Sequence, residues 1–250
     1  MTIEIIRCLS DNYAFLIHDS TSGETTLIDA PEAAPILDVL ADRGWVLTRV
    51  CLTHHHWDHV DGLAAIVAAT GAEVWGAAAD QHRLPPLDHA FAAGDTLPGG
   101  GQVLDAPGHT IGHIALYYPA LGALFTADSL MTHGCGRLFE GTADQMFDTI
   151  AQFAALPGET RLYAGHDYAA ANLAFAAKYA PDADALAARQ AELPVLARTG
   201  APTTGTTLTS EKRLNPYLRC DLPEVAAAAG LPGAAPRAVF AAIRTQKDNS

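Results

Sequence analysis

Four side chains that can bind a divalent cation lie within six residues of one another: His54, His56, Asp58 and His59. They follow an apolar run, Val50–Leu52, that is typical of a buried strand. Side chains two residues apart in an extended segment project to the same side, so His54 and His56 can bind one cation. Asp58 and His59 then enter the first turn of a helix, where they can face a second cation. The segment predicts metal chemistry at a turn from a strand to a helix.

Three further possible ligands stand singly along the chain, each just past a predicted strand and beside a small residue: His109, Asp128 and His166. With the first four they form a set of five histidines and two aspartates. This is enough for two sites of three ligands each and one shared carboxylate. Imidazole nitrogens suit zinc and iron, and carboxylates suit paired divalent ions. The pattern therefore predicts a binuclear metal centre.

A binuclear centre supplies its own nucleophile. Two divalent cations lower the pKa of a bound water toward neutrality, and the resulting hydroxide needs no serine or cysteine. Asp58 is the candidate to orient this hydroxide. The chain has no G-x-S-x-G segment, which excludes the usual serine hydrolase. Cys135 lies near His133 on a glycine-rich loop that fits substrate positioning better than nucleophilic attack.

Four other polar residues have less specific signals. Asp29 ends a predicted strand, and two interpretations stay open: a hydrogen-bonded support for a ligand, or the cap of a helix. His55 alternates to the opposite side of the extended turn and is not expected to bind metal. His113 and His133 are expected to support the ligands or to lie at the surface.

Strands and helices that would position these ligands can be placed by periodicity and by turn residues. Strands are predicted at 3–6, 14–17, 25–28, 50–53, 73–75, 102–104, 114–118, 124–126 and 161–163. Helices are predicted at 33–43, 62–70 and 142–156, the last with a capping box between Thr142 and Gln145. Beyond residue 168 only helices are expected, at 169–179, 182–193, 224–229 and 235–244, with a loop at 199–209. We therefore expect an α/β catalytic domain at 1–167 and a small helical, substrate-binding domain at 168–250.

Three motifs make the chain resemble a known family. The H-x-H-x-D-H motif with the later His, Asp and His resembles the metallo-β-lactamase fold, an αββα sandwich with metals at one edge. Within that superfamily, Thr53–His59, Gly108–His113 and Gly134–Gly141 are similar to the hydroxyacylglutathione hydrolases, or glyoxalase II. The resemblance extends through Glu211–Arg219 and Arg244–Asp248, so it covers nearly the whole chain.

The resemblance implies a role for each matching residue. His54, His56 and His109 would hold one metal, Asp58, His59 and His166 the other, and Asp128 would bridge them. Five residues would bind glutathione: Arg137, Phe139, Tyr168, Arg244 and Lys247. The family usually has Lys and Tyr where this chain has Arg137 and Phe139, so a cation is kept and one hydroxyl is lost. Arg244 and Lys247 lie three apart in a predicted helix and would share one face, where they could bind the glycine carboxylate.

The implied reaction is hydrolysis of the thioester S-D-lactoylglutathione, and of related 2-hydroxyacylglutathiones, to D-lactate and glutathione. This is the second step of methylglyoxal detoxification. Zinc is the expected metal, and iron or manganese would accept the same ligands. The alternatives are other reactions on the same fold, such as a persulfide dioxygenase with one iron, a lactonase or a β-lactamase. A nuclease and a non-hydrolytic binding protein are also alternatives.

Charge and composition limit the partners. The 250 residues have a net charge of −13, and 49% are hydrophobic. Residues 1–188 carry 7 basic and 23 acidic side chains, which disfavours nucleic acid. No apolar run is long enough for a membrane helix, and the first residues lack a signal-peptide pattern. Four dispersed cysteines suggest free thiols in a reducing compartment. We expect a cytoplasmic monomer that acts on a small molecule.

Overall fold

Two compact units make up the protein in this computed structural model, which describes all 250 residues. The first unit comprises Met1–Asp105 and Gly112–Leu121, and the second comprises Ala106–Ile111 and Gly122–Ser250. The boundary predicted between residues 167 and 168 falls inside the second unit and stays a prediction. No helix is both long enough and apolar enough to cross a membrane.

A six-stranded sheet is the main element of the first unit. Its strands follow one another in chain order: β1 (Thr2–Cys8), β2 (Asn12–His18), β3 (Glu24–Ile28), β4 (Val46–Leu52), β5 (Glu73–Ala77) and β6 (His89–Phe91). The first three pair antiparallel, and β3 to β6 pair in parallel. Parallel neighbours need a crossover, which α1 (Ala33–Arg43) provides between β3 and β4. The carboxyl end of β4 therefore opens into the segment that carries the first four predicted ligands.

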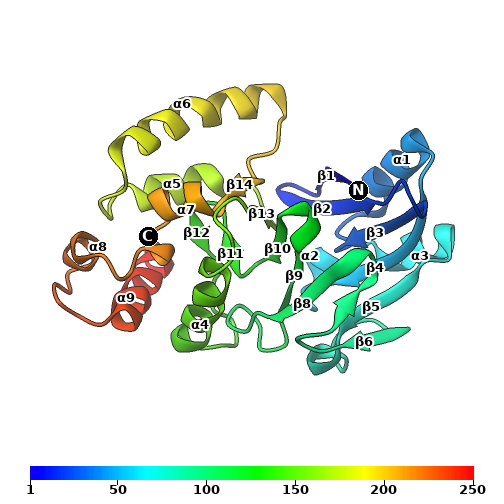
Figure 1. The fold of residues 1–250 in the computed structure, drawn as a ribbon, viewed down its shortest axis with the longest axis horizontal. Coiled ribbons are helices and arrows are strands. Elements are labelled where there is room, and N and C mark those ends of the chain that lie inside the picture. Colours follow the sequence, from blue (N-terminus) through cyan, green and yellow to red (C-terminus); the bar gives the residue numbers. More distant parts are fainter. The chain divides into compact units, whose positions relative to one another are not determined.

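Two helices cover a face of this sheet (Figure 1). Ile36 and Leu40 of α1, with Leu63 and Ile66 of α3 (Leu63–Thr70), pack against strand residues such as Leu52 in one apolar core. Both helices end at a glycine in the left-handed conformation, Gly44 and Gly71, which glycine adopts without steric cost. Between them, α2 (Trp57–Val60) is a single turn. The unit is completed by β7 (Thr96–Leu97), β8 (Gly101–Asp105) and β9 (Ile114–Tyr118), which pair antiparallel.

The second unit joins three strands, a hairpin and most of the helices. β10 (Ala123–Ala127) pairs in parallel with β13 (Arg161–Ala164), which pairs antiparallel with β14 (Thr206–Thr207). The hairpin consists of β11 (Leu130–Met131) and β12 (Gly134–Cys135). The capping box of α4 (Ala143–Ala154) is confirmed. The other helices are α5 (Ala169–Ala176), α6 (Ala183–Thr199), α7 (Leu208–Leu214), α8 (Pro223–Ala228) and α9 (Pro236–Asp248).

One predicted helix and one predicted loop were wrong in extent. The helix expected to end at residue 193 continues through Pro194 to Thr199. Proline costs the helix one hydrogen bond, but Leu193 and Leu196, on either side of it, both pack into an apolar cluster with Leu214. The loop expected at 199–209 gives way to β14 and to the start of α7, whose N-cap is Thr207.

A buried polar network in the second unit surrounds the carboxylate of Glu211, which is 0% exposed. This carboxylate accepts hydrogen bonds from the His133 backbone N–H at 2.8 Å, the Thr206 hydroxyl at 2.7 Å and Asn215 Nδ2 at 3.2 Å. Burial by itself raises the pKa of Glu211. The His133 ring, the His133 backbone N–H and the Thr206 hydroxyl together outweigh burial and hold the pKa of Glu211 below its ordinary value.

The lowered pKa of Glu211 predicts acid lability. A carboxyl whose folded-state pKa lies below its unfolded value contributes stability above the unfolded pKa and loses it as the pH falls through the folded one. Urea denaturation midpoints should therefore fall as the pH is lowered below about 4.5, and less steeply in Glu211→Gln. The exposed Glu224→Gln is the control and should follow the wild type. Equal slopes in all three proteins would contradict this prediction.

Candidate metal centre

The segment after β4 has the predicted form of a strand-to-helix turn. Leu52 ends the strand, and α2 begins at Trp57 with the preceding His56 extended at φ −61° and ψ 140°. The side chains of His54 and His59 are completely buried. Asn12 donates from Nδ2 to the backbone carbonyl of Asp58 at 3.0 Å and to its Oδ2 at 3.1 Å. Sequence reasoning missed Asn12, because a single Asn at a strand end is an ordinary turn residue.

Asp29 is the support for this turn, which resolves the choice left open above. Its Oδ1 accepts from the Thr53 backbone N–H at 2.8 Å, and its Oδ2 accepts from the Thr53 hydroxyl at 2.8 Å. Oδ2 also lies 2.9 Å from His59 Nδ1. Asp29 has a left-handed backbone with φ 57°, an uncommon conformation for a residue other than glycine. These hydrogen bonds offset the cost of the left-handed backbone and order the turn that carries the ligands.

Hydrogen bonds determine which nitrogen each imidazole leaves for a metal. A carboxylate only accepts, so His59 carries its proton on Nδ1 and leaves Nε2 as a ligand atom. The Thr53 hydroxyl donates to Asp29 and can therefore accept from His54 Nδ1, which is 3.0 Å away. His109 Nδ1 lies 2.7 Å from the carbonyl oxygen of Arg137, which is also only an acceptor. All three rings thus present Nε2, and their Nδ1 partners orient them as ligands require.

The three singly placed ligands lie close together in the second unit, with His109 and His166 near the carboxylate of Asp128. Asp128 Oδ2 lies 3.3 Å from His109 Nε2 and 3.4 Å from His166 Nε2. Gly136 N–H donates to the carbonyl of Ser129 at 2.9 Å, which brings the chain back against Asp128. A Cβ at Gly136 would lie 1.7 Å from the Asp128 carbonyl oxygen, so only glycine fits there.

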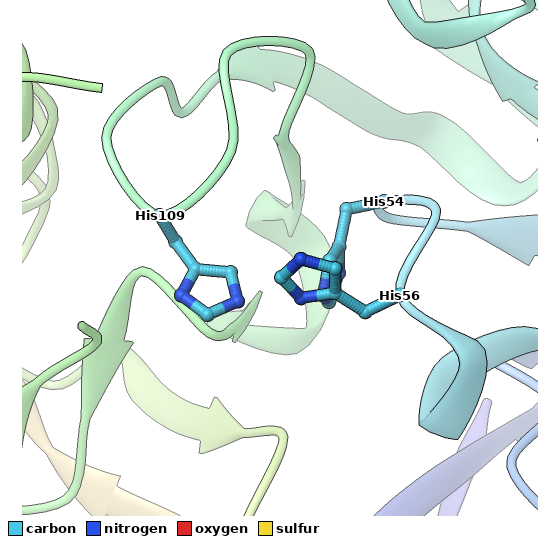
Figure 2. Close-up of side chains that lie close together, drawn as sticks. All are labelled: His54, His56 and His109. Carbon is cyan, nitrogen blue, oxygen red and sulfur yellow. The ribbon is translucent and has the colours of Figure 1, made fainter. Parts of the chain in front are cut away.

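Three groups of side chains have ligand atoms within 4.8 Å of one another. They are His54, His56 and His109 (Figure 2), then Asp58, His59 and His166, and finally Asp29, His54 and His59. In Figure 2 the three labelled imidazoles lie close together, as the ligands of one cation would. The Asp29 oxygens are already engaged by Thr53 and His59, so the third group describes support for ligands. The first two groups offer imidazole nitrogen and carboxylate oxygen, a donor set that fits divalent transition metals.

The histidines not expected to bind metal lie outside these groups. His55 Nδ1 is 2.9 Å from Asp80 Oδ2, and Asp80 also pairs with Arg83. His113 is buried with its ring stacked on His54, at 4.7 Å between centroids. His133 corrects the alternative of a surface residue: it is 1% exposed and belongs to the Glu211 network.

Two of the residues expected to bind glutathione flank the ligands of the second unit. Tyr168 stacks on His166, with centroids 4.8 Å apart and planes 5° from parallel. Phe139 meets His109 edge-on at 5.3 Å. Their exposed fractions are 41% and 61%, high for aromatic rings. The exposed Arg137 places its guanidinium 5.6 Å from the Phe139 centroid.

Arg244 and Lys247 of α9 differ in their burial and in the groups that they contact. Arg244 is 5% exposed, and its guanidinium donates to the Cys135 carbonyl at 2.6 Å and to Asp248 Oδ1 at 2.9 Å. The shared role of Arg244 and Lys247 in binding the glycine carboxylate stays a prediction, with Arg244 already bonded within the protein. Lys247 is half-buried with Nζ 5.0 Å from the Phe175 centroid. Burial, followed by the nearby cations Arg244 and Lys178, lowers the pKa of Lys247.

All four cysteines are free, as expected, and the structure buries each of them. Burial raises the pKa of each thiol, Cys8, Cys51, Cys135 and Cys220, to about 12. The thiolate is the reactive form, so at neutral pH the folded protein should react with a disulfide reagent at least about 100-fold more slowly than the urea-unfolded protein. One rapidly titrating thiol in the folded state would contradict this prediction and reopen Cys135 as a nucleophile.

Comparison with known proteins gives a consistent relationship along the chain. Residues 10–166 match the metallo-β-lactamase superfamily, and residues 167–250 match the hydroxyacylglutathione hydrolase C-terminus. A protein of Jannaschia sp. (strain CCS1) named hydroxyacylglutathione hydrolase is 53% identical over 247 residues, which cover 98% of this chain and 96% of the relative.

Solved structures share the fold. ETHE1 from Myxococcus xanthus is 27% identical, with a TM-score of 0.66 over 99% of this chain and 98% of its own. TTHA1623, in a di-iron-bound form, is 26% identical, with a TM-score of 0.59 over 67% of this chain and 92% of its own. The expected αββα fold class with a C-terminal helical domain is thus confirmed, and divalent metal binding is a property of the fold. The chain belongs to the hydroxyacylglutathione hydrolase family of the metallo-β-lactamase superfamily.

Proposed function

We propose that the protein hydrolyses the thioester of S-D-lactoylglutathione, and of related 2-hydroxyacylglutathiones, to D-lactate and glutathione. The single observation that carries this proposal is the full-length match to hydroxyacylglutathione hydrolases, which includes the family's own C-terminal region. Superfamily membership alone would leave many hydrolytic and oxidative reactions open. The reaction would be the second step of methylglyoxal detoxification.

Two metal sites are assigned to the seven predicted ligands. We propose that His54, His56 and His109 hold one ion and that Asp58, His59 and His166 hold the other. The grouping of their ligand atoms supports this division. Asp128 would be shared by the two ions, which is supported by the distances from its Oδ2 to His109 Nε2, 3.3 Å, and to His166 Nε2, 3.4 Å. Zinc is the proposed metal, and the same donors accept iron or manganese.

Two bound divalent cations would lower the pKa of a water toward neutrality and polarise the thioester carbonyl. The chain's own part is to hold and orient. Asn12 holds the carboxylate of Asp58 through a hydrogen bond to Oδ2, and Asp58 would orient the attacking water. Asp29 and the Arg137 carbonyl keep protons on the Nδ1 atoms of His59 and His109. A thiolate is a good leaving group, so the chemistry needs no strong general acid.

Glutathione binding is assigned to the exposed groups beside the ligands and to α9. Tyr168, Phe139 and Arg137 would contact the peptide, with Phe139 unable to donate the hydrogen bond of a tyrosine. Lys247 would bind the glycine carboxylate, because its ammonium, close to the cations Arg244 and Lys178, would attract an anion. Arg244 would act beside it, with the bonds of its guanidinium to Cys135 and Asp248 fixing its position.

The role of Lys247 predicts a binding defect. Lys247→Met keeps the apolar stem over Phe175 and removes the charge. We expect KM for the thioester to rise by about 10-fold, the magnitude of a hydrogen bond to a charged group, while kcat changes little because uniform binding is lost. Lys212→Met, an exposed lysine bonded to the Ala154 carbonyl, is the control. An unchanged KM, or a loss confined to kcat, would remove Lys247 from the substrate site.

A direct assay tests the proposed reaction. Purified, metal-loaded protein should abolish the ultraviolet absorbance of the S-D-lactoylglutathione thioester and release one free thiol per molecule hydrolysed. The same preparation is given glutathione persulfide with an oxygen electrode, and a lactone with a pH indicator. Thioester turnover with neither of the other reactions is the expected result. Oxygen uptake or lactone hydrolysis without thioester turnover would establish the alternative reaction on this fold.

The two domains, the cellular location and the oligomeric state of the protein can also be assigned as proposals. We propose that residues 1–167 act as the catalytic domain and residues 168–250 as the substrate-binding domain. The four thiols, none in a disulfide, support a cytoplasmic location with its reducing conditions. The acidic charge supports a small-molecule partner rather than nucleic acid. A monomer is proposed, and light scattering of the metal-loaded protein tests it.

A further inference from the structure

Arg189 of α6 is a buried cation with three bonded partners in the second unit, and it is 8% exposed. Its Nε donates to His133 Nε2 at 2.9 Å, and Nη2 donates to the Thr203 carbonyl at 2.6 Å. Nη1 pairs with Glu192 at 2.7 Å. A planar guanidinium can make these three contacts in fixed directions, whereas a lysine ammonium cannot reproduce them. The arrangement therefore joins two distant segments of chain at one point.

The first of these segments is the hairpin that follows Asp128. His133 lies at its tip, between β11 and β12, with a left-handed backbone at φ 58°. Arginine only donates, so His133 Nε2 accepts and the ring proton is on Nδ1, which faces Glu211 Oε1 at 3.2 Å. Glu211 also accepts from the His133 backbone N–H. The tip is thus held by hydrogen bonds at His133 Nε2 and at its backbone N–H, with Nδ1 close to the Glu211 carboxylate.

The base of this hairpin touches two predicted ligands. Gly136 lies against the Asp128 carbonyl, where no larger residue fits. The backbone carbonyl of the next residue, Arg137, accepts a hydrogen bond from His109 Nδ1. A displacement of the hairpin would therefore move Asp128 and turn the His109 ring.

The second segment follows the third ligand of this unit. Asp167 comes directly after His166, and its Oδ1 accepts a hydrogen bond from the Thr203 hydroxyl. The adjacent Thr204 hydroxyl accepts from the Ala164 backbone N–H at 2.9 Å, at the end of β13. The Thr203–Thr204 segment thus borders the chain on both sides of His166, and Arg189 holds its carbonyl.

We propose that Arg189 is a positioning residue for the metal centre, which holds the hairpin after Asp128 and the segment beside His166 at a fixed separation. The inference rests on the proposed ligand roles and not on the identity of the substrate. Arg189 reaches no ligand atom itself: it acts through His133 on Asp128 and His109, and through Thr203 on His166. Removal of its side chain would leave the buried His133 Nε2 and the Thr203 carbonyl without this donor, which favours rearrangement of both segments.

Metal affinity is the readout that separates positioning from general stability. Arg189→Met, Arg189→Lys and the control Arg161→Met are compared by competition with a chromophoric zinc chelator. Arg161 is a matched control, because it is exposed and donates to the Gly205 carbonyl in the same loop at 2.8 Å. Outer hydrogen-bond partners of metal ligands are worth roughly 10- to 100-fold in affinity. We expect Arg189→Met to lose zinc affinity in this range, Arg189→Lys to lose less, and Arg161→Met to match the wild type.

A second variant, at His133, tests the proposal in case Arg189→Met does not fold. His133→Asn keeps a residue that tolerates the left-handed backbone but cannot reach both Arg189 and Glu211. It should weaken zinc binding without a change in KM for any thioester the protein hydrolyses. Wild-type zinc affinity in folded Arg189→Met or His133→Asn, even with a lower Tm, would overturn the proposal. If the wild type binds two zinc ions but hydrolyses no thioester, the proposed function fails while this inference is still tested by affinity.

Discussion

Asp128→Ala is expected to remove most of the metal from both sites at once and to abolish turnover. The Asp128 carboxylate lies within 3.4 Å of two ligand nitrogens, His109 Nε2 and His166 Nε2, which are assigned to different ions. Without it, each site loses a shared anionic donor and the two cations face each other with less negative charge between them. Metal analysis of the purified protein should fall from about two equivalents per chain to well below one.

An exposed carboxylate serves as the control for Asp128. Asp105 ends β8 and is exposed, so Asp105→Ala should retain the wild-type metal content. Circular dichroism of Asp128→Ala should show that the fold persists. If Asp128→Ala keeps one tightly bound metal and full activity, the centre is not binuclear, and a one-metal reaction such as the dioxygenase alternative gains support.

Asp58→Asn is expected to preserve the fold and lower kcat by more than about 100-fold, since even an outer partner of a ligand is worth roughly 10- to 100-fold. The amide has the same shape but no charge, so it weakens the second metal site. It also removes the negative charge of the carboxylate that Asn12 holds through Oδ2 and that would orient the attacking water. The site built from His54, His56 and His109 keeps its ligands. Metal analysis should therefore show about one equivalent retained.

Two comparisons make the Asp58 prediction specific. Asp61→Asn changes an exposed carboxylate just beyond α2 and should leave kcat and metal content unchanged. Asn12→Ala removes only the hydrogen bonds to Asp58 and should lower kcat by a smaller factor with both metals retained. A fully active Asp58→Asn protein would remove Asp58 from the catalytic assignment.

Local sequence determined which residues can bind metal and which ends of strands carry them. The ligands follow β4, β8, β10 and β13, whose apolar composition and flanking turns are visible within a few residues. The capping box at Thr142 and the glycine stops at Gly44 and Gly71 also depend on neighbours along the chain. Such features are predictable because their free energy comes from contacts within one or two turns of the backbone.

Tertiary structure decided how those ligands are oriented and what the remaining charges do. Asp29 meets His59 30 residues away, Arg189 meets His133 56 residues away, and Arg244 meets Cys135 109 residues away. Each contact satisfies a buried polar group with a partner that no local spacing identifies. The spacing of Arg244 and Lys247 predicted one shared helix face. It did not show that the Arg244 guanidinium is buried and donates to backbone carbonyls. Desolvation makes an unpaired buried charge costly, and only the packed structure shows which groups are buried and therefore need partners.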